Sequence, residues 1–149
     1  MALISIVVPA YNEATSLSPF LEQLGAVLSP LPDTFELVLI DDGSVDGTWA
    51  LARTLAMPRT LVRGMRFSRN FGKEAAIAAG LDTARGDAVI VMDADLQHPP
   101  SLIPEMIRRW RDGAPMVQAV KSGRGREKLK KILGVRRGPG WIEAACGGN

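Results

Sequence analysis

Two aspartates one residue apart, at the end of an apolar run, are the residues of this chain best placed to do chemistry. Asp93 and Asp95 come directly after the hydrophobic segment 88–92, and Gln97, His98 and two prolines follow them. Open α/β sheets bind ligands in the crevice at the carboxyl ends of their strands. Two close carboxylates repel each other, and a Mg²⁺ or Mn²⁺ ion between them takes oxygen ligands and can hold substrate phosphates. The spacing predicts metal-assisted chemistry on a phosphorylated donor, although a bare Asp-x-Asp is more typical of a turn that caps the next helix.

A second pair of acids follows another apolar run. Asp41 and Asp42 come directly after segment 35–40, so at least one carboxylate is expected to reach the same edge of the sheet. A carboxylate there can accept hydrogen bonds from a base or from ribose hydroxyls; the alternative is an Asx turn with Gly43. Glu13 can also accept from a ribose, or it is an exposed residue in the first turn of a helix.

Other residues near these acids suit a nucleotide or its phosphates. Lys73 opens a predicted helix after Gly72, where backbone N–H groups and a cation together favour phosphate, although a solvated basic turn is equally consistent. Tyr11 can stack on a base or pack under its loop. His98 can join a metal shell or serve the structure. The spacings of a P-loop and of a dinucleotide-binding glycine motif are both absent.

Strand and helix patterns alternate along the first 120 residues. Apolar runs predict strands over residues 3–8, 35–40, 61–67, 88–92 and 116–120, and helical spacing predicts helices over 17–28, 48–55, 72–84 and 102–110. This alternation is typical of an α/β fold with a mainly parallel sheet. The loops 9–13, 41–44, 67–73 and 93–100 then share one edge of the sheet, and each of them carries unusual polar residues.

Length and composition indicate one globular domain. The chain has 149 residues, of which 46% are hydrophobic, and its single cysteine favours a reducing compartment. The N-terminus reads as a buried strand and not as a signal peptide. No stretch has the eighteen or so apolar residues of a membrane span. We therefore expect a cytoplasmic protein that can also lie at the cytoplasmic face of a membrane.

Charge divides the chain unequally. Residues 1–107 carry 7 basic and 13 acidic side chains, whereas residues 108–149 carry 11 basic and 3 acidic ones. A basic segment binds phosphate or simply forms a solvated face. Nucleic acid is not expected as a partner, because no aromatic residue lies within the basic run 121–131. From residue 132 the periodicity is lost, so we expect a domain over 1–131 and a divergent tail over 132–149 that is disordered or folds poorly.

Four motifs in this order resemble those of family 2 glycosyltransferases. They are Pro9-Ala10-Tyr11-Asn12-Glu13, Asp41-Asp42-Gly43-Ser44-x-Asp46-Gly47-Thr48, Arg69-Asn70-x-Gly72-Lys73 and Asp93-Ala94-Asp95-Leu96-Gln97-His98-Pro99-Pro100. They are most similar to the branch of dolichol-phosphate mannosyltransferases and bacterial polyprenyl-phosphate glucosyltransferases. The resemblance covers residues 4–130 and implies the GT-A fold, a Rossmann-like three-layer sandwich.

The resemblance also implies roles for individual residues. Asp93 and Asp95 are implied as catalytic residues and, with Gln97, as ligands of Mg²⁺ or Mn²⁺ against the donor diphosphate. Arg124, after the fifth strand, is implied to contact a phosphate of the donor or the acceptor. The residues implied to bind the nucleotide are Pro9, Ala10, Tyr11, Glu13, Asp41, Asp42, Lys73, Asp93 and Ala94.

The implied reaction moves a glucose- or mannose-class sugar from a UDP- or GDP-linked donor to polyprenyl or dolichyl phosphate, with inversion. Members of this branch continue past the fifth strand with an acceptor-binding segment and often membrane helices. We therefore expect this chain to be truncated or frame-shifted. The alternative function is that of a nucleotide- and metal-binding module without efficient turnover.

Overall fold

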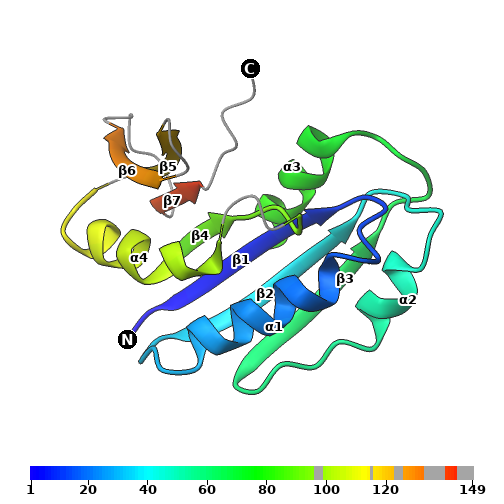
Figure 1. Cartoon of the computed structure of the whole chain (residues 1–149), viewed down its shortest axis with the longest axis horizontal. Helices are drawn as coiled ribbons and strands as arrows, with labels where there is room; N and C mark the ends of the chain where they lie inside the picture. Colours follow the sequence, from blue (N-terminus) through cyan, green and yellow to red (C-terminus); the bar gives the residue numbers. More distant parts are fainter. Residues whose placement is uncertain (96–98, 115, 123–125, 133–139, 144–149) are drawn as a thin grey trace.

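The computed structural model describes residues 1–95, 99–114, 116–122, 126–132 and 140–143, with side chains described up to residue 114. Within these residues one sheet has the strand order β3-β2-β1-β4-β7-β5-β6 (Figure 1). The strands are β1 (Leu3–Ala10), β2 (Thr34–Asp41), β3 (Thr60–Arg66), β4 (Ala88–Val91), β5 (Met116–Ser122), β6 (Arg126–Ile132) and β7 (Gly140–Glu143). All neighbouring pairs are parallel except β5 and β6, which form an antiparallel pair.

Helices cover both faces of this sheet. They are α1 (Leu17–Leu28), α2 (Thr48–Arg53), α3 (Lys73–Thr83) and α4 (Ile103–Arg111), with a 3-10 turn η1 (Pro100–Leu102) before α4. Helices α1 and α4 bury leucine, isoleucine and methionine side chains in the larger apolar core, and α1 crosses in front of the sheet in Figure 1. Helix α3 packs on the other face. The predicted α/β fold with three layers and a mainly parallel sheet is confirmed.

The side chains of β2 alternate between these two layers. Phe35, Leu37 and Leu39 lie in the core under α1 and α2, whereas Val38 and Ile40 lie in the core under α3. Because the side-chain period of a strand is two, Glu36 lies on the α3 face as well. Its carboxylate is nevertheless almost fully buried. A charge in that position needs hydrogen-bond partners, and the partners come from around the end of α3.

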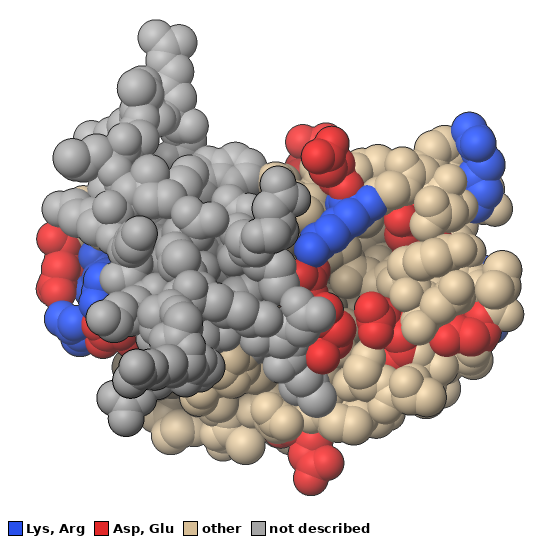
Figure 2. Space-filling model, turned by 45° about the horizontal axis from the view of Figure 1, so that its top comes forward, with Lys and Arg blue, Asp and Glu red and all other residues tan. Residues whose placement is uncertain are grey.

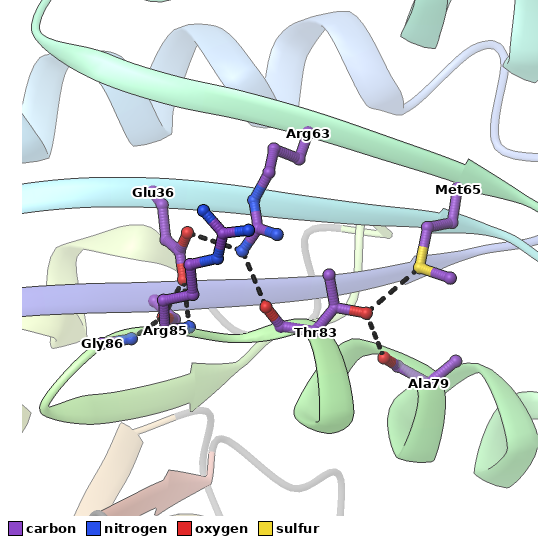
Figure 3. A network of polar contacts seen from close by, with 8 residues as sticks. Glu36, Arg63, Met65, Ala79, Thr83, Arg85 and Gly86 are labelled. Carbon is purple, nitrogen blue, oxygen red and sulfur yellow. Dashed lines mark hydrogen bonds and ion pairs between the residues drawn. The ribbon is translucent and has the colours of Figure 1, made fainter.

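A network of polar contacts fixes the C-terminal end of α3 to the sheet (Figure 3). The Glu36 carboxylate accepts hydrogen bonds from the Ser5 hydroxyl and the Arg85 N–H, and lies 2.7 Å from Arg63 Nη2. The same guanidinium donates to the Thr83 carbonyl. Burial alone would raise the pKa of Glu36, but the hydrogen bonds and the Arg63 charge together hold it below its ordinary value.

Helix α3 lies unusually close to the strands beneath it. Its two fully buried positions are Ala76 and Gly80, both with minimal side chains. A Cβ on Gly80 would come within 2.3 Å of Val7 Cγ1. The close approach leaves little freedom for α3 to shift, so the position of its first residue, Lys73, is set by the sheet.

The predicted elements agree with the structure except in their bounds and near the C-terminus. Helix α3 begins at Lys73 and not at Gly72, and α2 has only six residues. The largest differences are the strands β6 and β7. No strand is predicted over residues 126–132, whereas β6 pairs there with β5. Residues 140–143 are expected in a tail that is disordered or folds poorly, but the four residues of β7 pair with β4 and β5 inside the sheet, where parallel partners satisfy the backbone groups. The predicted boundary at residue 131 stays a prediction.

Candidate functional site

Four loops meet at the carboxyl ends of β1 to β4 and enclose an open cavity of about 270 Å³. This is close to the lower end of the range of small-molecule pockets. Figure 2 shows a hollow in the surface with acidic side chains around it and basic side-chain atoms beside them. The residues that line the cavity are Pro9, Ala10, Tyr11, Glu13, Asp42, Asn70, Gly72, Lys73, Asp93 and Asp95.

The acidic pair after β4 lies in this cavity. Ile90, Met92 and Ala94 point into the core under α1 and α4, so the alternation of side chains turns Asp93 toward the α3 face. The Asp93 carboxylate is largely shielded, and its Oδ2 lies 2.7 Å from Lys73 Nζ. The cavity therefore brings a carboxylate and an ammonium group from different loops into direct contact.

Asp42 holds the loop that leads into α3. Its two carboxylate oxygens accept hydrogen bonds from the backbone N–H groups of Phe71 and Gly72, and one also accepts from the Asn70 side-chain amide. Asp42 is 3% exposed. In this structure it therefore acts on the loop 70–72, although the resemblance implies a place beside the base or ribose.

Asp41 and Ala94 do not line the cavity, although both are implied as nucleotide-binding residues. Asp41 is fully buried on the α2 side of the sheet, where Oδ1 accepts the N–H of Ser44 at 3.0 Å and Oδ2 lies 3.6 Å from Arg66 Nε. Ala94 is buried in the larger core. Both positions follow from the strand period, which turns alternate side chains away from the α3 face.

The loops after β1 and β2 are joined by side-chain hydrogen bonds. Ser44 Oγ accepts from the N–H of Asn12, and Thr48 Oγ1 accepts from the N–H of Glu13. Asn12 is one of two described non-glycine residues with positive φ. Tyr11, at 45% exposed, stands at the opening of the cavity. These bonds fix the backbone that carries Tyr11 and Glu13 to the start of α2.

Sequence reasoning assigned no role to Asn70, which lines the cavity. The sequence singles out Gly72 only for its position before Lys73, yet Gly72 also lines the cavity and has a φ of 102°, which favours glycine. Both are part of the third motif, so a signal was available. Gln97, His98 and Arg124 lie outside the described residues, and their expected roles stay predictions.

The oxygen atoms at the cavity fit a hard divalent cation. Asp93 and Asp95 supply carboxylate oxygens at the cavity, and Mg²⁺ is typically held by one or two carboxylates together with substrate phosphates and water. Among the described residues no group of three or more His, Cys, Asp or Glu side chains gathers as a ready-made metal cage. The arrangement suits a cation that arrives with a phosphorylated ligand.

Comparison with known proteins identifies the family. The sequence profile of Glycosyl transferase family 2 matches residues 5–141. The chain belongs to this family. It is 44% identical over 129 residues to the bactoprenol glucosyl transferase of Shigella phage SfV, a match that covers 86% of this chain and 42% of that protein. It is 42% identical over 123 residues to the undecaprenyl-phosphate 4-deoxy-4-formamido-L-arabinose transferase of Aeromonas hydrophila, covering 82% of this chain and 38% of that one.

A solved structure confirms the fold of this member of the family. The mannosyltransferase PcManGT from Pyrobaculum calidifontis, in complex with GDP-Man and Mn²⁺, matches with a TM-score of 0.67 at 27% identity. The match covers 80% of this chain and 34% of that one. The expected GT-A fold is therefore confirmed. The chain spans about 40% of the length of the curated relatives it matches, and no helix in its described part is long and apolar enough to cross a membrane.

Proposed function

We propose that this chain forms the donor-binding part of an inverting, metal-dependent glycosyltransferase that moves a sugar from a nucleotide diphosphate to a polyprenyl phosphate. The observation that carries the proposal is the cavity at the strand ends, where Asp93 and Asp95 lie with Lys73 beside an open space. The name of the Aeromonas relative supports a polyprenyl phosphate acceptor. The name of the phage relative supports a bactoprenol acceptor and a hexose, glucose, as the transferred sugar. That acceptor also supports a place at the cytoplasmic face of a membrane.

Different residues bind the two ends of the donor, the nucleoside and the diphosphate. Pro9, Ala10, Tyr11 and Glu13 receive the base and ribose, and the acidic pair would hold a Mg²⁺ or Mn²⁺ ion. When bound, that ion stabilises the negative charge that develops on the departing diphosphate. The Lys73 ammonium binds a phosphate oxygen of the same leaving group. The mannosyltransferase complex with GDP-Man and Mn²⁺ supports this combination of ligands.

The attack by the acceptor requires no strong base from the protein. An oxygen of the acceptor phosphate attacks the anomeric carbon from the face opposite the nucleotide, and the bond from that carbon to the diphosphate oxygen breaks. This displacement inverts the anomeric centre. A phosphate acceptor is already ionised near neutral pH, so no strong general base is required.

Calorimetric titration with UDP and with GDP, each with and without Mn²⁺, tests the donor site. We expect one of the two nucleotides to bind in a Mn²⁺-dependent manner, which also indicates the base. Asp93→Asn and Asp95→Asn are each expected to weaken that binding about tenfold or more without changing the fold. Asp112→Asn, which changes an exposed aspartate beyond the end of α4, is the matched control. Unchanged Mn²⁺ dependence in both cavity variants would contradict the ligand assignment.

The second candidate function is a nucleotide- and metal-binding module without efficient turnover. It is supported by the cavity, because each described residue that lines it is proposed either to bind the donor or to hold a loop around the cavity. Transfer of radiolabelled sugar to undecaprenyl phosphate in detergent separates the two. Labelled lipid that depends on Mn²⁺ supports the transferase, and nucleotide binding without labelled lipid supports the module.

A further inference from the structure

Lys73 crosses the cavity and pairs with one of the two carboxylates proposed to hold the cation. Its Nζ lies 2.7 Å from Asp93 Oδ2, a charge-assisted hydrogen bond at ideal distance. The Lys73 side chain is 54% exposed and that of Asp93 only 13%. The carboxylate is therefore held in the wall of the cavity, and the ammonium group is the mobile partner that reaches it from the open side.

The backbone below Lys73 is fixed although its side chain is exposed. The N–H of Gly72 donates to Asp42, and α3 packs tightly on the sheet through Gly80. The four-carbon stem of lysine is flexible, so Nζ can move within the cavity while Cα stays in place. The ammonium group can therefore exchange its carboxylate partner for another anion without any change in the fold.

The two proposed ligands each compete with one half of this ion pair. A divalent cation at the acidic pair needs the Asp93 oxygens and is repelled by the nearby ammonium charge. A diphosphate needs the Lys73 ammonium. Either ligand binding alone has to break the pair, whereas together they break it only once. The cost is shared, so each ligand strengthens the binding of the other.

We propose that Lys73 is an internal counter-ion that couples divalent cation binding to nucleotide diphosphate binding. Without nucleotide it neutralises Asp93 and keeps the affinity for free metal low. When the diphosphate enters, Lys73 moves to a phosphate oxygen and releases Asp93 to the cation. This inference rests on the proposed donor site and adds an order to it: the chain favours a metal–nucleotide pair over either ligand alone.

Mn²⁺ binding to the whole chain, followed by the EPR signal of free Mn²⁺, tests the coupling without any enzymatic assay. The titration is done with no nucleotide and with saturating UDP or GDP, in the wild type, Lys73→Met and Lys73→Gln. Arg69→Met is the matched control, since it removes a positive charge from the loop that precedes Lys73. The Arg69 guanidinium lies over the Phe71 ring. Circular dichroism establishes that each variant is folded. Two different substitutions of Lys73 are used, so that the test remains possible if one of them does not fold.

We expect Mn²⁺ alone to bind about fivefold more tightly to both Lys73 variants than to the wild type or Arg69→Met. The factor by which nucleotide improves Mn²⁺ affinity should fall by a similar amount in these variants. If wild-type chain binds nucleotide with Mn²⁺ but both Lys73 variants keep wild-type Mn²⁺ affinity, the counter-ion role alone is overturned. If folded wild-type chain binds neither nucleotide, the proposed donor site fails and the coupling with it.

Discussion

Each end of α3 is held by a buried carboxylate that accepts backbone N–H groups, but the two carboxylates serve different purposes. Glu36 and Asp42 lie six residues apart on one face of β2 and its extension, and each accepts backbone N–H groups from a loop next to α3. At the Glu36 end the partners include the Arg63 guanidinium, and protein groups enclose the carboxylate. At the Asp42 end the loop leads to Lys73, whose charge reaches across an open cavity.

This difference separates stability from binding. A buried carboxylate with a complete set of protein donors contributes to folding, and no ligand is needed to satisfy it. An ion pair at the wall of an open cavity contributes less to folding but can be exchanged for a ligand. Helix α3 is thus anchored to the core at its C-terminal end, whereas its N-terminal end, held by Asp42, presents an exchangeable charge at the cavity.

Glu36→Gln should have the largest effect on stability. The amide cannot neutralise Arg63 and turns an NH₂ group toward the donors that Glu36 now accepts from, so we expect a loss of about 3 kcal/mol. Urea unfolding followed by circular dichroism measures it. Ser5→Ala removes one donor to Glu36 and the acceptor of the buried Gly86 N–H, and should cost about 1 to 2 kcal/mol. Equal losses in the two variants would contradict the central place of the carboxylate.

Gly80→Ala should disturb both ends of α3 together. The new methyl group would meet Val7 Cγ1, so the helix must move away from the sheet, at a cost of about 2 kcal/mol. Nucleotide affinity should fall as well, because Lys73 moves with the helix. Ala78→Gly, at an exposed position of the same helix, is a control that changes helix propensity alone. Unchanged nucleotide affinity in Gly80→Ala would indicate that α3 does not position the site.

Asp42→Asn should separate binding from folding. The loop 70–72 loses a charged acceptor, for which we expect a cost of about 1 kcal/mol in stability and about tenfold in nucleotide affinity. Calorimetry with Mn²⁺ present measures the affinity. The folded fraction of Glu36→Gln should keep wild-type affinity in the same titration. If Glu36→Gln weakens binding as much as Asp42→Asn, the two ends are not distinct in function.

The pH dependence of stability should show the smallest effect. The folded-state pKa of Glu36 lies below its ordinary value of 4.5, so the ionised form is favoured by folding. Its contribution is complete above 4.5 and is lost as the pH falls through the lower, folded-state pKa. The difference in unfolding free energy between wild type and Glu36→Gln should therefore stay constant above about pH 5.5 and shrink in acid. A difference that grows in acid would contradict this.

Much of the fold was predictable because it depends on local patterns. The leucines and Phe20 at helical spacing predict α1, and the apolar runs predict the first five strands to within two residues. The strands β6 and β7 were not predictable in this way. The residues of β6 are mostly charged, and the four residues of β7 are too few to show a period.

The alternation of strand and helix patterns already implies that four loops converge on one edge, since parallel strands bring their carboxyl ends together. These loops carry the acids at 41–42 and 93–95, the residues before Lys73 and the residues 9–13. The partners of each acid, and so its role, follow from the tertiary structure. The handedness of the crossovers and the strand register put Asp42 under the loop 70–72 and Asp41 on the opposite face. They also brought Lys73 to Asp93, and Glu36 to donors more than twenty-five residues away. The sequence gives the chemical type of each side chain. Which charged groups pair with one another depends on their distances in space, and these distances are set only when the sheet folds.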